Sequence, residues 1–355
     1  AVAELSPVCN FMDKSSSQSE FEIIRRYFAN PNLSFKRDGI ELGIGDDAAL
    51  IDVPANKHLA MSMDVLISGI HFPADADPAL IANRSLAVNL SDLAAVAAQP
   101  YCFTLGLVLP DSDEIWLQRF SEGLASLAKQ YNCPLVGGDT SRGPLSISIQ
   151  VQGLVDRSQA ARRSAANFGD KIYVSGNLGD GAVALLALGL DSHLGSSFSF
   201  AAQSLSDQDR QYFSDAFFKP QPQLELAAAA GKLFSSCIDI SDGLQGDLGH
   251  ILAASSMAAT VNIDALPYSM PTQRCMDTEN RIMAALFGGD DYQLCFTVPE
   301  EDCAELERLA RDIGVRVSCI GEIVSGEGVA YLDTDGAPVD FSTRAYQHFA
   351  SVQSA

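Results

Sequence analysis

The chain has 355 residues, of which 47% are hydrophobic and 19% are charged, a composition typical of an ordered protein large enough for two domains. Its formal net charge of −22 argues against a partner with a phosphate backbone, such as a nucleic acid, and against an anionic membrane surface. No apolar run approaches the roughly 20 residues needed to cross a bilayer, and eight scattered cysteines without a CxxC pair indicate reduced thiols in the cytoplasm, not a zinc site.

After a short helix at Ser19–Phe28, residues 43–72 are predicted to form two strands, because apolar residues alternate along them. Asp46 and Asp47 follow the first glycines, and Asp64 lies within the second strand. Like charges held a few ångströms apart are costly unless a cation lies between them. On its own, the Asp46–Asp47 pair fits a solvated acidic hairpin equally well.

A helix is predicted to begin at Asp77, with proline at its first position, and to end near residue 98. Its surface is mostly apolar, but Ser85, Asn89 and Asp92 fall at helical spacing on one face. Taken alone, this polar stripe is more simply interpreted as facing water. The alternative is that it meets polar partners inside the fold.

Two further strands, Tyr101–Leu109 and Leu145–Val155, are predicted around a helix at Asp113–Gln130. Between them lies Gly137-Gly-Asp-Thr140, where glycines can bring backbone N–H groups close to phosphate oxygens, although this motif alone is a weak signal. The polar segment 156–170 marks the junction between domains. We therefore expect a flexible extension at 1–19, an N-terminal domain at 20–156 and a C-terminal domain at 157–355.

The second half repeats the acidic pattern. A strand ends in Cys237-Ile-Asp-Ile-Ser-Asp-Gly243, and Gly288-Gly-Asp-Asp291 leads into a strand at Tyr292–Val298. Residues 191–210 are rich in Ser and Asp and predict a mobile insertion. Because strands alternate with helices in both halves, the predicted fold class is α/β (α+β) with two domains.

The recurring aspartates lie at strand ends, on glycine turns or on one helix stripe, where such folds present site residues. They are Asp47, Asp64, Asp92, Asp139, Asp239 and Asp242. Oxygen ligands without His or Cys favour Mg²⁺, which commonly bridges carboxylates to substrate phosphates. The chain contains no P-loop, no protein-kinase glycine-rich loop and no EF-hand, so a bound nucleotide would be held in an unusual way.

Eight motifs occur in a fixed order: GIGDDAAL (43–50), MDVLISGIHF (63–72), LAVNLSDLAA (86–95), GGDT (137–140), RSAANFGD (163–170), IDISDGL (238–244), GGDDYQL (288–294) and AYQHF (345–349). Together they resemble the thiamine-monophosphate kinase family, in the superfamily of aminoimidazole ribonucleotide synthetase. The resemblance covers nearly the whole chain from about Glu20.

The resemblance implies two aminoimidazole ribonucleotide synthetase-like domains, each a mixed sheet flanked by helices, and a homodimer formed through the N-terminal domains. It also implies an activity: ATP and thiamine monophosphate give ADP and thiamine diphosphate, the last step of thiamine diphosphate biosynthesis, with several Mg²⁺ ions. The acceptor is itself a phosphate monoester, largely dianionic because its second pKa is about 6. A general base is therefore unnecessary, and direct in-line transfer is expected.

Carried over motif by motif, the resemblance implies three sets of site residues. The Mg²⁺ ligands would be Asp47, Asp64, Asp92, Asp139, Asp239 and Asp242, with Ser62 and the main chain of Met63 close by. The ATP contacts would be Gly138, Asp139, Arg163 and Ser241. The thiamine monophosphate contacts would be His71, Asp290 and Tyr346.

The chain departs from the family pattern at Met63, where Thr is common, and at Asp290, which replaces the more usual Glu and is shorter by about 1.5 Å. Structural roles remain as alternatives for His71, Arg163 and Tyr346. Two other functions also remain as alternatives: a selenophosphate synthetase-like enzyme, although Cys9 lacks the glycine-rich setting expected there, and a non-catalytic metal-binding protein.

Overall fold

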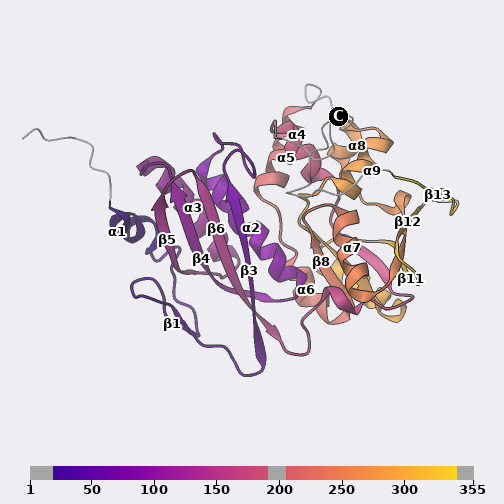
Figure 1. The fold of residues 1–355 in the computed structure, drawn as a ribbon, viewed down its shortest axis with the longest axis horizontal. Coiled ribbons are helices and arrows are strands. Elements are labelled where there is room, and N and C mark those ends of the chain that lie inside the picture. The colour runs from indigo at the N-terminus through magenta and orange to yellow at the C-terminus, as the bar shows by residue number, and fades with distance from the viewer. Residues whose placement is uncertain (1–18, 191–204, 342–355) are drawn as a thin grey trace, which may run out of the picture.

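The computed structural model of the chain describes residues 19–190 and 205–341, which form two lobes lying side by side (Figure 1). The first lobe contains α1 (Glu20–Ile23), a π-helical turn (Ile24–Phe28), β1 (Ile40–Leu42), β2 (Leu50–Ile51), β3 (Lys57–Ile67), α2 (Pro78–Ala95), β4 (Gln99–Leu109), α3 (Glu114–Gln130), β5 (Leu135–Arg142) and β6 (Ser146–Asp156). The second contains β7 (Lys171–Ser175), α4 (Asp180–Ala187), α5 (Asp207–Phe218), α6 (Leu224–Ala230), β8 (Ser236–Ile240), α7 (Leu244–Ser255), β9 (Ala258–Asn262), α8 (Met270–Cys275), α9 (Thr278–Phe287), β10 (Gln293–Val298), α10 (Cys303–Asp312), β11 (Val317–Val324), β12 (Gly328–Leu332) and β13 (Pro338–Val339).

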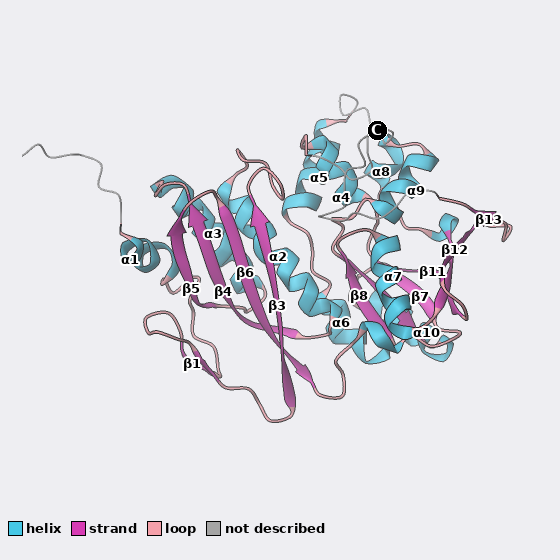
Figure 2. Ribbon diagram, viewed as in Figure 1, coloured by secondary structure: helices cyan, strands magenta, loops and turns pink. Residues whose placement is uncertain are grey.

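Each lobe is built on one mixed sheet with helices packed against it (Figure 2). The first sheet has the order β3-β6-β4-β5, in which only β4 and β5 are parallel. The second has the order β13-β12-β9-β11-β7-β10-β8, in which β9 and β12 form the parallel pair. This architecture confirms the predicted fold class.

Helix α2 lies between the two sheets and packs against both (Figure 2). It contacts β3 and β6 of its own lobe, and β8, β10, α5 and α6 of the second lobe. Leu86 and Leu90 of α2 and Ile238 and Ile240 of β8 belong to one cluster of buried apolar side chains that extends through both lobes. The seam between the lobes is therefore packed like the interior of a single domain.

The interpretation of the polar stripe on α2 as facing water is wrong. Ser85 and Asn89 are fully buried, and Asp92 is half-buried. The stripe is buried because α2 has a sheet on either side, and nothing in the local sequence distinguishes that position from a helix with one face in water.

Residues 207–218 also differ from the expectation of a mobile insertion at 191–210, because they form α5, which Ser206 caps by accepting a hydrogen bond from the N–H of Asp209. Phe213 and Phe217 anchor this helix in the core, and both are fully buried. Residues 191–204 lie outside the described part of the chain.

Strand β3 is an edge strand with an apolar outer face. Its alternate side chains are exposed by 37% to 55%; they are Leu59, Met61, Met63, Val65 and Ile67. Because successive side chains of a strand point to opposite faces, Ser62 and Asp64 point toward α2 instead. Single exposed apolar residues are ordinary, but an unbroken row on an edge strand is typical of an association surface.

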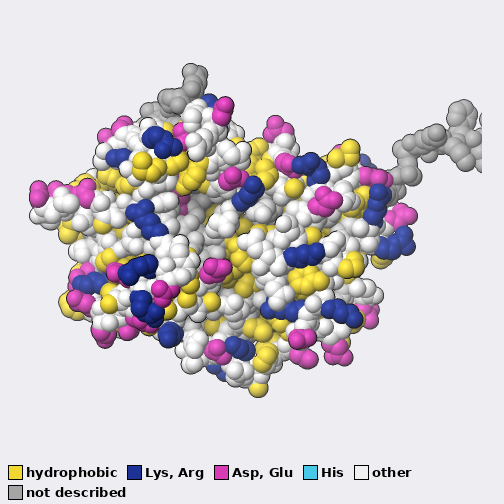
Figure 3. All heavy atoms as spheres, turned by 180° about the vertical axis from the view of Figure 1, so that it is seen from behind, with side chains coloured by type: hydrophobic (Ala, Val, Ile, Leu, Met, Phe, Trp, Pro, Cys, Tyr) yellow, Lys and Arg dark blue, Asp and Glu magenta, His cyan; other side chains and the backbone are white. Residues whose placement is uncertain are grey.

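The side of the molecule opposite to that of Figure 1 carries acidic and basic side chains of both lobes, interspersed with apolar ones (Figure 3). Within residues 19–190 and 205–341, no helix combines the length and the apolarity that crossing a membrane requires.

Candidate active site

Three carboxylates from the two lobes interact at the seam. Asp64 of β3 and Asp92 of α2 come from the first lobe, and Asp239 of β8 comes from the second. Burial, together with the charge of Asp92, raises the pKa of Asp64 to about 6 and that of Asp239 to about 8. Burial also raises the pKa of Asp92. Carboxylates held near one another in a partly dry seam are poised to bind a cation.

The polar stripe of α2 holds β3 in place at this point. The side-chain oxygen of Asn89 accepts a hydrogen bond from the N–H of Asp64 (3.0 Å), and its amide nitrogen donates to the carbonyl of Ser85 (2.9 Å). The hydroxyl of Ser62 donates to Oδ2 of Asp92 (2.6 Å), which partly offsets the effect of burial on the pKa of that carboxyl. Strand and helix are thus joined through the residues predicted to surround the metal.

The side chain of Met63 is 54% exposed on the outer face of β3, away from Asp64. It therefore has no part in the carboxylate cluster, and only its main chain lies beside those residues.

A second acidic group surrounds the turn after β8. Oδ2 of Asp247 accepts hydrogen bonds from the N–H groups of Ser241 (3.0 Å) and Asp242 (3.1 Å). Burial, together with the charge of Asp242, raises the pKa of Asp247 to about 7. Sequence reasoning did not single out Asp247 as the residue that holds this turn, although acidic residues are favoured in the first turn of a helix.

Arg163 lies in a short 3₁₀ turn at Arg163–Ala165 and is exposed. Its positive charge partly offsets the effect of burial on the pKa of both Asp92 and Asp247. Arg163 therefore lies within electrostatic reach of carboxylates from both lobes, which a plain linker residue need not do.

Asp47, Gly138 and Asp139 line one cavity of about 670 Å³. The φ of Gly138 is +154°, and a Cβ there would lie 1.9 Å from the carbonyl oxygen of Leu105, so only glycine fits. Its lining also includes the apolar side chains of Phe21, Ile24 and Phe28. Asp47 and Asp139 are exposed, so the lining of the cavity combines carboxylates and glycines with apolar side chains.

The predicted acceptor residues lie where β3 and β10 approach α2. The main-chain N–H of Ile67 donates to Nδ1 of His71 (3.0 Å), which orients the imidazole ring. Asp290 is fixed by a two-point ion pair with Arg84 of α2. Tyr346 lies outside the described residues.

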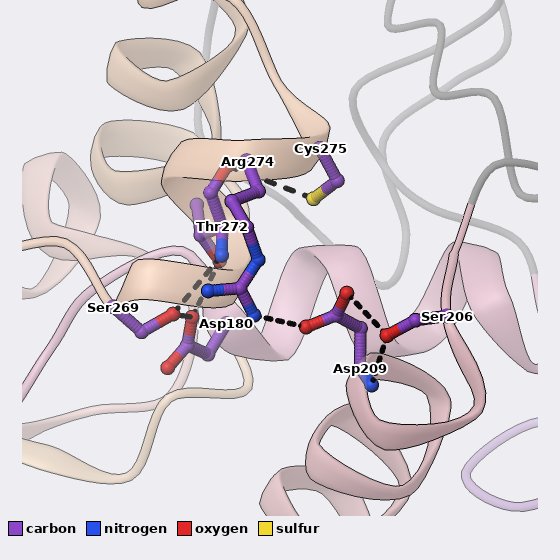
Figure 4. Close-up of polar contacts among 7 residues, drawn as sticks. All are labelled: Asp180, Ser206, Asp209, Ser269, Thr272, Arg274 and Cys275. Atoms are coloured by element: carbon purple, nitrogen blue, oxygen red, sulfur yellow. Dashed lines mark hydrogen bonds and ion pairs between the residues drawn. The ribbon is translucent and has the colours of Figure 1, made fainter.

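A further cavity of about 540 Å³ lies beside Asp290 and Asp291. One of its walls is held by Asp180 at the start of α4, whose carboxylate accepts hydrogen bonds from Ser269 (2.6 Å), Thr272 (2.5 Å) and Tyr212 (2.6 Å). Figure 4 shows this carboxylate beneath α8, next to a second contact in which Arg274 of α8 pairs with Asp209 of α5. These contacts hold α4 and α5, which line the cavity, against α8.

In the part of the chain that the structure describes, no three Asp, Glu, His or Cys side chains are grouped closely enough to hold a metal ion by themselves. Asp64, Asp92 and Asp239 nevertheless fit Mg²⁺ as a resident ion, because Mg²⁺ keeps several waters and takes one or two carboxylates plus substrate phosphates. Burial and mutual repulsion raise the pKa values of Asp64 and Asp239. A bound cation would offset both effects, because it favours the ionised carboxylates.

Comparison with known proteins gives two adjacent family matches. Residues 45–155 match the AIR synthase related protein, N-terminal domain, and residues 167–333 match the AIR synthase related protein, C-terminal domain. A curated thiamine-monophosphate kinase of Escherichia coli (strain K12) is 42% identical over 333 residues, which cover 94% of this chain and 98% of the relative.

Two solved structures are similar in both sequence and fold. The crystal structure of thiamine-monophosphate kinase from Stenotrophomonas maltophilia K279a has a TM-score of 0.76 and 41% identity, covering 86% of this chain and 93% of that chain. A structure described as AaThiL complexed with AMPPCP and TMP has a TM-score of 0.70 and 29% identity, covering 86% and 92%.

Proposed function

The chain belongs to the thiamine-monophosphate kinase family of AIR synthase related proteins, and we propose that its seam transfers the γ-phosphate of ATP to thiamine monophosphate. The observation that carries this proposal is that Asp64 and Asp92 of the first lobe lie within electrostatic reach of Asp239 of the second. Bringing two polyanions together requires concentrated positive charge, and these carboxylates are the groups that would hold it.

ATP occupies the cavity lined by Asp47, Gly138 and Asp139. The apolar side chain of Phe21 suits a nucleobase, and the glycines at 137 and 138 allow backbone N–H groups to approach phosphate oxygens. Arg163 and Ser241 complete the phosphate contacts. The AMPPCP bound by AaThiL is an analogue of ATP and therefore supports a nucleotide site in this family.

Several Mg²⁺ ions are held by Asp47, Asp64, Asp92, Asp139, Asp239 and Asp242, with Ser62 and the main chain of Met63 beside them. When bound, Mg²⁺ screens both substrates and stabilises charge on the group in transfer. The residues of the chain hold this arrangement: Ser62 orients Asp92, and Asn89 fixes the backbone of Asp64.

His71, Asp290 and Tyr346 contact thiamine monophosphate. The acceptor oxygen needs no general base, because a phosphate monoester with a second pKa of about 6 is already largely dianionic near neutral pH. Transfer is therefore direct and in line, without a phosphoenzyme. A phosphorylated protein trapped after incubation with ATP alone would contradict this step.

The protein acts as a homodimer in the cytoplasm, with residues 20–156 forming both the dimer contact and most of the nucleotide site. The exposed apolar row on the edge strand β3 supports this, because such a strand is stabilised by pairing with a second copy. Cys102, Cys133 and Cys237 are free and buried, as expected in a reducing compartment.

The test is to incubate the protein with ATP, Mg²⁺ and thiamine monophosphate and to measure thiamine diphosphate and ADP by chromatography. We expect equal amounts of the two products, and none when Mg²⁺ is removed by a chelator. An inert mixture, or ATP consumption only with a different acceptor, would refute the proposed function. Thiamine and thiamine diphosphate serve as control acceptors that lack the substrate's single phosphate group.

A further inference from the structure

Arg84 of α2 is a buried cation at the seam between the lobes. Its side chain is 4% exposed, and its Nη2 and Nη1 atoms lie 2.6 and 3.0 Å from Oδ1 and Oδ2 of Asp290. Nη1 also donates to the carbonyl of Phe217 (2.9 Å), and Nε donates to the carbonyl of His71 (3.2 Å). One side chain therefore joins α2 to the turn after β3, the end of α5 and the turn before β10.

Stability alone does not account for this contact. A buried ion pair loses much of its attraction to the cost of desolvation, and apolar residues of similar volume often stabilise a core as well or better. A planar guanidinium that binds both oxygens of a carboxylate does, however, fix the distance and the orientation of that carboxylate. Such a contact is suited to holding Asp290 in one position.

The backbone conformation of Asp290 also indicates that this residue is held in one position. Its φ is +62°, a left-handed conformation that is unfavourable for residues other than glycine, and Tyr292 has a φ of +47°. The N–H of Asp290 donates to the carbonyl of Ser241 (2.8 Å), in the turn that also carries Asp242. The unfavourable conformation is therefore maintained by contacts on both the main chain and the side chain.

We propose that Arg84 is a positioning residue for the acceptor: it holds Asp290 of the second lobe and the turn at His71 of the first lobe in one fixed arrangement. The inference rests on the proposed function, in which these two residues contact thiamine monophosphate. Arg84 lines neither the cavity of about 670 Å³ nor that of about 540 Å³, whereas Asp290 lines the latter, so Arg84 acts through Asp290.

Arg84 and Asp290 are matched in length. Glutamate at position 290 would move the carboxylate forward by about 1.5 Å, toward a guanidinium whose other donors already bind Phe217 and His71. Lysine at position 84 keeps the charge but is shorter and lacks the two-point fork. A longer acid facing a shorter base restores one ion-pair contact, although not the two-point one, so the two changes together are less harmful than either alone.

The test compares R84K, D290E and the double variant R84K/D290E in steady-state kinetics with each substrate varied in turn. We expect each single change to raise KM for thiamine monophosphate by about 10-fold, with KM for ATP within about twofold of the wild-type value. The double variant recovers at least about half of that loss on a logarithmic scale. R119K is the matched control, because Arg119 also binds both oxygens of an aspartate, Asp77, but does so on the surface.

Thermal unfolding of each variant is measured alongside. If a single variant does not fold, binding of thiamine monophosphate and of AMPPCP to D290N is measured by calorimetry, and only the affinity for thiamine monophosphate should fall. Equal changes in KM for both substrates would overturn the proposal. So would a double variant in which the effects of R84K and D290E on KM simply multiply. The proposed function would stand in either case. Wild-type protein that makes no thiamine diphosphate would overturn both.

Discussion

Replacing Asp64 with asparagine should stabilise the metal-free protein above pH 6 and abolish its turnover. The carboxyl of Asp64 has a pKa of about 6 in the folded chain, against an ordinary value of 3.8, because it is buried beside Asp92. The folded state therefore disfavours the ionised form. This group contributes its full share of stability below about pH 4 and loses that share as the pH rises through about 6.

The magnitude follows from the shift. A difference of about 2 pKa units corresponds to about 3 kcal/mol, since one unit is about 1.4 kcal/mol. Asparagine has nearly the same size and carries no charge, so in D64N this loss does not occur. At pH 8 in a chelator, the variant should be more stable than the wild type by up to about 3 kcal/mol, or about 5 °C in Tm.

The assay is thermal unfolding followed by circular dichroism at pH 4.5 and pH 8, with a chelator or with Mg²⁺. The stabilisation at pH 4.5 should be only about a third of that at pH 8, because the folded carboxyl is then still mostly protonated. Mg²⁺ should raise the Tm of the wild type more than that of D64N, because a bound cation favours the ionised carboxylate. D335N is the matched control, since Asp335 is exposed in the turn before β13 and should show neither effect.

The reasoning would be refuted if D64N were no more stable than the wild type at pH 8 in chelator, or if its advantage were the same at both pH values. Normal turnover of D64N at saturating Mg²⁺ would separately remove Asp64 from the metal site.

Three further outcomes are expected. S62A removes the hydrogen bond that lowers the pKa of Asp92, so the Mg²⁺ concentration needed for half-maximal activity should rise several-fold at pH 6.5 and less at pH 8.5; an unchanged requirement at both would contradict this. G138A brings a Cβ within 1.9 Å of the Leu105 carbonyl, so we expect lower thermal stability and at least about 10-fold weaker AMPPCP binding by calorimetry. M61E places a charge in the apolar row of β3 and should shift sedimentation from dimer to monomer; a dimer that persists would place the interface elsewhere.

The sequence was sufficient to predict those parts of the fold that a few neighbouring residues determine. The strands that carry Asp64 and Asp239 could be predicted, because apolar residues alternate along the first and fill most of the second. The glycine at 138 was likewise visible, since two adjacent glycines before an aspartate indicate close backbone approach. These features depend on a few neighbouring residues, so periodicity and turn chemistry are enough to predict them.

The rest of the candidate site depends on contacts between segments that are far apart in the chain, and no short stretch of sequence encodes these contacts. The stripe at Ser85 and Asn89 looks the same whether one sheet or two enclose the helix, so its burial could not be inferred locally. Arg84 was not singled out, because its partner Asp290 is 206 positions away in the chain. Asp290 itself could be predicted only as a substrate contact, whereas its carboxylate is bound by an arginine that only the folded seam brings within reach.

The continuous apolar cluster around α2 has a consequence for how the molecule comes apart. Because Leu86 of the first lobe and Ile238 of the second share one interior, separating the lobes would expose surface that belongs to both. The cores of the two halves are continuous, so unfolding of one should destabilise the other. The chain should accordingly denature in a single cooperative transition, and a fragment cut at the junction near residue 156 should associate with its complement or precipitate.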